Sequence, residues 1–166
     1  MKYLNLSRST RAVLFLLCLT SLSAANDPGD LDATFGKGGR IFRPATGEWW
    51  LMQSSAGATT FQFGQGTDRI TPGDYTGDGK ADCAVWRPST GEWFVLRSED
   101  SSYFSFPFGT TGDLPAPGDY GGDGKFDAVV FRPSSGIWFV QQSTNGLEVF
   151  QWGLNGDRPV SGSFVR

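Results

Sequence analysis

An acidic turn occurs twice in this chain, at the same place relative to the sequence around it. The two copies read PGDYTGDGKADCAVWRP at 72–88 and PGDYGGDGKFDAVVFRP at 117–133. Each copy has an aspartate at loop positions 1, 5 and 9, which gives Asp74, Asp78 and Asp82 and then Asp119, Asp123 and Asp127. Three carboxylates this close repel one another unless a cation neutralises them, and oxygen ligands spaced along a glycine-bent turn suit calcium. The pattern predicts two calcium loops within a repeated architecture.

The acidic turns belong to a threefold repeat with a period of about 45 residues. A tight turn between apolar runs recurs in FRPATGEWW, WRPSTGEWF and FRPSSGIWF, which begin at Phe42, Trp86 and Phe131. In the first repeat Thr34 and Gly38 replace the aspartates of positions 5 and 9, so we expect no metal there. The repeats run over about 28–71, 72–116 and 117–161.

Within each repeat the sequence predicts strands and turns. Nearly continuous apolar runs at 83–86 and 128–131 predict strands that are covered on both faces. The Pro-Ser-Thr-Gly turn at 88–91 predicts a hairpin, because proline and glycine favour its dihedral angles. Further strands are expected at 92–96, 103–108, 137–140 and 147–152, with 114–117 as a short edge strand or an extended link. The prediction is an all-β fold with up to four strands per repeat.

The acidic turns, together with Phe-Gly landmarks that start at Phe63 and Phe108, resemble the FG-GAP and VCBS-type repeats of secreted and cell-surface proteins. In that family one repeat forms one blade of a β-propeller, and a DxDxDGxxD loop binds calcium. The resemblance implies two sets of metal ligands, with main-chain carbonyls from the lysines: Asp74, Thr76, Asp78, Lys80 and Asp82, and Asp119, Asp123, Lys125 and Asp127. At loop position 3 the chain departs from the family, since Thr76 offers only a hydroxyl and Gly121 offers no side chain. The second loop is therefore expected to bind calcium more weakly.

The acidic turns admit two other interpretations. An EF-hand needs a bidentate glutamate at loop position 12, where this chain has Val85 or Val130 inside a predicted strand, so that interpretation fails. The second is that the aspartates only cap the turns through hydrogen bonds to main-chain amides, as Asp and Asn often do. This alternative stays open beside calcium binding.

Two further residue types recur at a fixed place in every repeat. Trp49, Trp93 and Trp138 share one position, which favours packing over stacking on a sugar ring, although a carbohydrate-binding (lectin-like) module remains the functional alternative. Arginines at 43, 87 and 132 precede the turn proline. We expect them to make a structural ion pair or carbonyl contact with a neighbouring repeat rather than a ring that binds anions.

The first 25 residues have the pattern of a secretory signal peptide. A positively charged start precedes an apolar core at 12–22, which is too short to span a membrane, and small residues follow at 23–25. The mature region would be one domain at 26–166. Loss of Lys2, Arg8 and Arg11 with the signal changes the formal net charge from −3 to −6. An acidic chain of this kind argues against nucleic acid and anionic membranes as partners.

The sequence also argues against an enzyme. It contains no histidine, which excludes Ser–His, Cys–His and His-ligated zinc chemistry. Glu48 and Glu92 occupy equivalent repeat positions, and a catalytic carboxylate pair needs two different environments. Cys83 is the only cysteine after the signal, and we interpret it as a strand residue. The sequence thus favours a secreted, non-enzymatic, calcium-binding module for adhesion or for binding an extracellular protein or glycan.

Three propeller-type blades are too few for an ordinary closed ring, which has about 4–8. The chain is therefore expected to be a fragment of a larger extracellular protein, to join a second copy in a homodimer of two half-propellers, or to fold as a β-trefoil. As half-propellers, the first and third repeats would leave apolar outer faces uncovered, including Trp49, Trp50, Trp138 and Phe139.

Export with cleavage near Ala25 is the first testable prediction, because small residues precede Asn26 and follow the apolar core. Intact-mass measurement of secreted material should give a chain that starts at about residue 26. A retained N-terminus on secreted protein would contradict the prediction.

Overall fold

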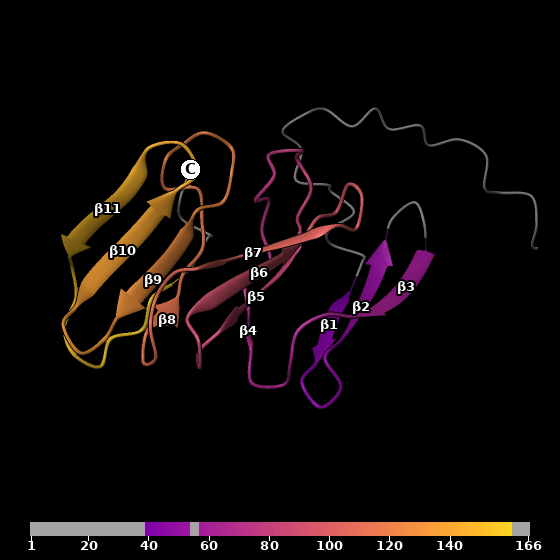
Figure 1. Ribbon diagram of the computed structural model, residues 1–166, viewed down its shortest axis with the longest axis horizontal. Helices are drawn as coiled ribbons and strands as arrows, with labels where there is room; N and C mark the ends of the chain where they lie inside the picture. Colours follow the sequence, from indigo (N-terminus) through magenta and orange to yellow (C-terminus); the bar gives the residue numbers. More distant parts are fainter. Residues whose placement is uncertain (1–38, 54–56, 161–166) are drawn as a thin grey trace, which may run out of the picture.

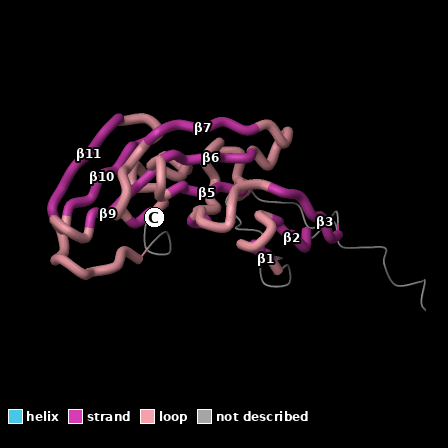
Figure 2. Tube along the Cα trace, turned by 60° about the horizontal axis from the view of Figure 1, so that its bottom comes forward, coloured by secondary structure: helices cyan, strands magenta, loops and turns pink. Residues whose placement is uncertain are grey.

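The computed structural model describes residues 39–53 and 57–160 (Figure 1). The described chain consists of eleven strands joined by loops and turns and contains no helix (Figure 2). It therefore has no helix that could cross a membrane. The all-β prediction is confirmed. The predicted export signal at 1–25 and the acidic-loop counterpart of the first repeat lie outside the described residues.

The strands form three antiparallel sheets that stand side by side in chain order and do not close into a ring (Figure 1). The first sheet holds β1 (Arg40–Arg43), β2 (Glu48–Gln53) and β3 (Gly57–Gln62). The second holds β4 (Arg69–Ile70), β5 (Cys83–Arg87), β6 (Glu92–Leu96) and β7 (Tyr103–Pro107). The third holds β8 (Leu114–Pro115), β9 (Ala128–Arg132), β10 (Ile137–Gln142) and β11 (Gly146–Gln151).

The short first strand of the second and third sheets comes from the end of the preceding sequence repeat. β4 pairs with β5, with Arg69 opposite Trp86 and Ile70 opposite Val85. β8 pairs with β9 in the same way, so the 114–117 segment supplies a paired strand. Each four-stranded sheet therefore joins residues from two sequence repeats, and main-chain hydrogen bonds link consecutive repeats. The first sheet has three described strands, with β1 at its edge.

The core lies along the central strands. Ala84, Val85 and Trp86 of β5 are fully buried, and β9 is buried along its first four residues. This confirms the prediction that the two apolar runs are covered on both faces. Cys83 is half-buried at the start of β5, and burial raises the pKa of its thiol to about 11. A thiol with such a pKa is a poor nucleophile at neutral pH, in accord with its interpretation as a strand residue.

The repeated tryptophans pack in the core, and Trp93 shares a cluster with Ala128 and Val130 of the third sheet. Trp49, Trp93 and Trp138 are all buried. Their indole N–H groups donate to the main-chain carbonyls of Phe63, Phe108 and Trp152 at 2.8, 3.0 and 2.7 Å. The packing interpretation is confirmed, and these rings cannot stack on a sugar.

The expectation that Trp49 and Trp138 lie on uncovered outer faces is wrong. Trp138 stacks against Phe150 of its own sheet, with ring centroids 6.0 Å apart, so its burial needs no further sheet. Phe139 is half-buried, and Trp50 is 38% exposed. The large apolar residues of the first and third sheets and of the loop after β11 that are at least half exposed are instead Ile41, Met52, Leu147, Val149, Trp152, Leu154 and Val160.

A buried ion pair fixes each junction between consecutive sheets. Arg87 at the end of β5 donates from Nε and Nη2 to the two carboxylate oxygens of Asp68, at 3.0 and 2.9 Å. Arg132 at the end of β9 binds Asp113 at 2.8 and 2.9 Å. Each aspartate ends the loop that leaves the preceding sheet. The expected structural ion pair with a neighbouring repeat is confirmed for both arginines.

That loop also contacts the hairpin turn of the sheet it leaves. Gly91 has φ +68°, and a Cβ added there would lie 2.3 Å from the carbonyl oxygen of Gly109. The amide of Phe108 donates to the carbonyl of Gly91 at 2.7 Å. Because the approach is between main-chain atoms, no side-chain rearrangement can make room for a methyl group.

Gly91→Ala should destabilise the protein more than Gly122→Ala. Both glycines have positive φ, +68° and +71°, so both substitutions carry the left-handed strain of roughly 1–2 kcal/mol. Gly122 has nothing within 4 Å of an added Cβ, whereas Gly91 meets main-chain oxygen. Urea unfolding should therefore give a clearly larger loss for Gly91→Ala. Equal losses in the free energy of unfolding would mean that the close contact between Gly91 and the Gly109 carbonyl does not constrain the turn.

Candidate functional site

The two acidic turns lie at the same end of neighbouring sheets, at the top of Figure 1. The first connects β4 to β5 and the second connects β8 to β9. Each is closed at its base by an isolated antiparallel bridge, Gly73 with Asp82 in the first turn and Gly118 with Asp127 in the second. The closed base brings loop position 9 back beside the start of the turn.

The aspartate at loop position 1 is enclosed by the main chain of its own turn. Oδ1 of Asp74 accepts from the amides of Gly77 and Asp78 at 2.6 and 3.3 Å, and Oδ2 accepts from Gly79 at 2.8 Å. Asp119 repeats the arrangement with the amides of residues 122, 123 and 124 at 2.6, 3.1 and 2.9 Å. These amides offset the carboxylate charge and hold the turn in its bent form.

The aspartates at positions 5 and 9 of the first turn meet at Ser98, in the connection between β6 and β7. Asp82 is buried and accepts from the amides of Tyr75 and Ser98 at 3.0 and 2.8 Å. Asp78 is exposed and accepts from the Ser98 hydroxyl at 3.3 Å and from the amide of Lys80 at 2.8 Å. The Lys80 ammonium lies 4.0 Å from Asp78 in an exposed ion pair.

The second turn is built in the same way around Ser143, between β10 and β11. The buried Asp127 accepts from the amides of Tyr120, Gly121 and Ser143 at 2.7, 3.1 and 2.8 Å. Asp123 accepts from the hydroxyls of Ser143 and Thr144 at 2.5 and 3.0 Å and from the amide of Lys125 at 2.9 Å. The Ser143 hydroxyl is the largest cause that lowers the pKa of Asp123 below its usual value.

Ser98 and Ser143 are site residues that the sequence reasoning missed. Each lies 20 residues after the position 5 aspartate of its loop. Ser54 occupies the corresponding position of the first repeat in the sequence. Their fixed phase in all three repeats was the signal that could have identified them.

The six aspartates therefore cap their turns, as the alternative interpretation expected. Within the described residues no three acidic or cysteine side chains gather in a way that could hold a metal ion. The chemistry of the donors still suits calcium, because a carboxylate has about four acceptor positions and those of Asp78 and Asp82 are not all occupied. The position 3 residue Thr76 lies with its hydroxyl 3.5 Å from Oδ1 of Asp74. Calcium binding at the two turns stays a prediction.

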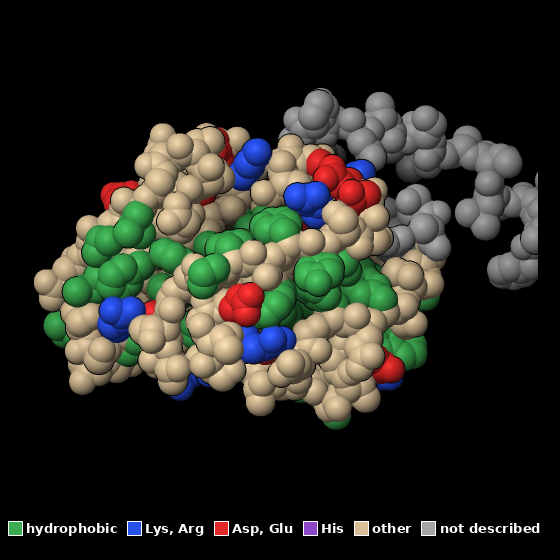
Figure 3. All heavy atoms as spheres, in the orientation of Figure 1, with side chains coloured by type: hydrophobic (Ala, Val, Ile, Leu, Met, Phe, Trp, Pro, Cys, Tyr) green, Lys and Arg blue, Asp and Glu red, His purple; other side chains and the backbone are tan. Residues whose placement is uncertain are grey.

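A shallow groove of about 260 Å³ lies between the second and third sheets, beside the second acidic turn. Its walls carry four half-buried aromatic rings, together with Lys125, Gln141, Gln142 and Ser143; the rings belong to Tyr75, Phe104, Phe106 and Phe126. Figure 3 shows apolar side chains gathered on the face in view. Such a groove could receive an apolar or aromatic group of a partner.

Asp82→Ala should destabilise the protein far more than Asp78→Ala. Removal of the buried Asp82 carboxylate leaves the amides of Tyr75 and Ser98 without acceptors, and one orphaned buried amide costs about 1–3 kcal/mol. Among the described residues Asp78 accepts only from the Lys80 amide and the Ser98 hydroxyl, both on exposed residues, so its truncation should cost about 1 kcal/mol, as loss of a capping side chain does. Denaturant unfolding in the presence of a chelator measures both. Equal losses would show that the buried network does not hold the turn.

A comparison with protein-family models matches residues 74–130 to an FG-GAP-like repeat. The match runs from position 1 of the first acidic turn through the second sheet to β9 and includes the second acidic turn. A comparison with curated proteins and a comparison with solved structures both gave no match.

Proposed function

We propose, from the match of residues 74–130 to an FG-GAP-like repeat, that the chain is an exported, calcium-binding, non-enzymatic module of the adhesion type. The observation that carries the proposal is that one acidic turn is built twice, with the same hydrogen bonds, at the same end of two sheets. A catalytic site combines groups whose environments differ. Two turns of the same structure instead suit a binding role in which each turn holds the same kind of ligand.

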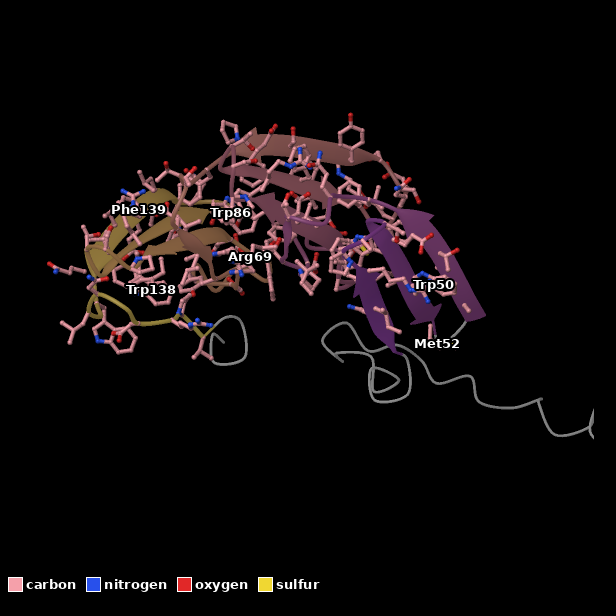
Figure 4. The ribbon with its side chains drawn as sticks, turned by 90° about the horizontal axis from the view of Figure 1, so that it is seen from below. Trp50, Met52, Arg69, Trp86, Trp138 and Phe139 are labelled. Atoms are coloured by element: carbon pink, nitrogen blue, oxygen red, sulfur yellow. The ribbon has the colours of Figure 1, made fainter. Side chains whose placement is uncertain are left out.

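We propose that the sheets are blades of the β-propeller type. Three features support this: the strands of each sheet follow chain order, a short strand from the end of one sequence repeat pairs in the sheet of the next, and the sheets stand in an arc (Figure 4). A β-trefoil would need strands that pair between its repeats around a barrel. The described strands hydrogen-bond only within the three separate sheets, which favours blades.

Calcium would be held by the carboxylates at loop positions 1, 5 and 9. The proposed ligands also include the main-chain carbonyls of Lys80 and Lys125 and the hydroxyl of Thr76. The ion would supply a positive charge to the carboxylates at these three loop positions, which would have to converge on it, and so stiffen the turn. Ser98 and Ser143 support this role, because each already orients the position 5 and position 9 carboxylates of its turn. Gly121 adds no ligand, so the second turn should be weaker.

An extracellular protein or glycan is the proposed partner. The aromatic groove beside the second turn supports a binding role, since half-buried rings there can contact an apolar group. The repeated tryptophans do not support a lectin-like site, because all three are buried. A carbohydrate ligand would have to use the groove instead.

Calcium should raise the melting temperature of the mature chain, and magnesium should raise it less. Magnesium demands near-ideal octahedral geometry and loses water reluctantly. Affinity should be on the order of 10⁻⁴–10⁻³ M, as in extracellular modules. The stabilisation should reach about 2.7 kcal/mol at a hundredfold excess over Kd. Isothermal titration and thermal unfolding with and without chelator measure these quantities.

The double variant Asp78→Asn, Asp123→Asn should lose the calcium response while it keeps the fold, since asparagine is nearly isosteric and its amide oxygen can still accept from the Lys80 and Lys125 amides. The matched control Glu99→Gln removes one exposed charge outside the turns and should respond as the unaltered chain does. A melting temperature that is the same in chelator and in millimolar calcium would reject calcium binding.

A further inference from the structure

The clamp at each sheet junction has three parts: an aspartate, an arginine and an aromatic ring. Arg87 binds Asp68 and lies over Phe94, with 4.3 Å from its guanidinium carbon to the ring centroid. In the next clamp Arg132 binds Asp113 and lies over Phe139, at 4.4 Å. Both aspartates also accept the amide three residues earlier, at 2.9 and 3.0 Å. The loop amide thus orients the carboxylate half of each clamp, and the aromatic ring orients the guanidinium half.

The carboxylate half of a third clamp lies at the end of the third sheet. Asp157 accepts the amide of Leu154 at 2.8 Å, as Asp68 and Asp113 accept theirs. Asp68 and Asp113 are buried by their arginines, whereas Asp157 is exposed. No described arginine forms an ion pair with it, and its loop already has the conformation of the filled clamps.

The arginine half of a third clamp lies on the first sheet. Arg43, at the end of β1, lies over the ring of Trp50 at 4.1 Å. Its ion pair within the described residues is a single exposed contact with Glu48 at 3.4 Å. The sequence position that corresponds to Asp68 one repeat earlier holds Ala24, which has no carboxylate. The two unfilled halves have opposite charge.

Apolar residues at the two ends match in the same way. Val85 and Val130 are fully buried, and a Cβ at Gly64 or Gly109 would lie 3.2 or 3.0 Å from their methyl groups. The first-sheet equivalent, Ile41, is 57% exposed. The equivalent of the two glycines, Gly153, belongs to the loop of Asp157. One end thus presents the apolar side chain and the other presents the glycine that covers it.

Among the described residues, a segment that could complete a sheet is present at one end, and β1 has no partner on its outer edge at the other. Residues 158–159 follow Asp157 as β4 follows Asp68 and β8 follows Asp113, but they belong to no sheet. After them, Val160 is 70% exposed, whereas its equivalents Thr71 and Ala116 are buried. β1 is the edge strand of the first sheet, where β5 and β9 each have a short partner. Figure 4 shows Trp50 on the first sheet and Trp138 on the third at opposite ends of the arc.

We propose that a second copy of this chain joins these halves. Residues 157–160 of one protomer add to the edge of β1 of the other as a short strand, and Asp157 binds Arg43 of the partner subunit. By the register of β4 on β5, residue 158 would lie opposite Phe42 and residue 159 opposite Ile41. The reverse contact forms at the same time, because the interface is two-fold symmetric. Two sets of three sheets make six, within the usual range of about 4–8 blades.

The choice of a second copy rests on complementarity at four places: charge, apolar contact, strand edge and the buried position of residue 160. Each follows a junction that the chain already makes twice within itself. The inference builds on the blade arrangement proposed above and is independent of calcium. The two proposals can therefore be told apart: the chain could bind calcium as a monomer, or form the dimer without binding calcium.

The test is the mass of the mature chain in solution, measured by light scattering and sedimentation. The unaltered chain should be a dimer. Arg43→Asp alone and Asp157→Arg alone should each weaken the dimer at least tenfold, because like charges then meet at both junctions. A one-to-one mixture of the two variants should dimerise again. In the mixed dimer one junction keeps the native pair and the other has the pair reversed.

Two matched charge reversals serve as controls. Arg69→Asp and Glu99→Arg alter exposed residues away from both ends and should leave the dimer unchanged. Circular dichroism should show all variants folded, since Arg43 and Asp157 are both exposed in one protomer. A monomeric unaltered chain, dimers that both single variants retain, or folded variants that stay monomeric when mixed would each overturn the proposal.

Discussion

The Arg–Asp ion pair at each junction is the interaction on which the arrangement of the sheets depends. Its carboxylate is buried, and a buried charge without a partner is strongly unfavourable, so aspartate and arginine must meet whenever the sheets assemble. The bidentate geometry fixes orientation as well as distance. The aromatic ring beneath the guanidinium limits its position further. One clamp thereby sets where the next sheet begins.

Orientation of the sheets determines where the acidic turns lie. Each turn begins directly after the short strand that the clamp positions, and it ends where the buried central strand begins. Both turns consequently project from the same end of the array. Ser98 and Ser143 then connect each turn to a later connection of its own sheet, so the turn is held from two directions.

The carboxylates of the turns face a competition between two kinds of partner. Main-chain amides satisfy Asp74 and Asp119 almost completely, while Asp78 and Asp123 each accept a single main-chain amide and otherwise bind hydroxyls. A carboxylate lone pair that accepts a hydrogen bond from an amide is not available to coordinate a cation. The exposed aspartates at position 5 are therefore the ones most open to an ion. The buried aspartates at position 9 contribute chiefly to the shape of the turn.

The sequence by itself determined the features that depend on neighbouring residues. Apolar runs predicted the central strands, proline and glycine predicted the hairpin turns, and the period of about 45 residues predicted that Trp49, Trp93 and Trp138 share one packing role. The tertiary structure decided which distant residues meet. Asp68 and Arg87 lie 19 residues apart and pair only because β4 crosses into the next sheet. Ser98 likewise meets Asp78 and Asp82 only because the connection after β6 folds back to the acidic turn. Trp138 is covered by Phe150 only because β11 pairs with β10. Local periodicity encodes the strands and turns, whereas contacts between them depend on which strands become neighbours.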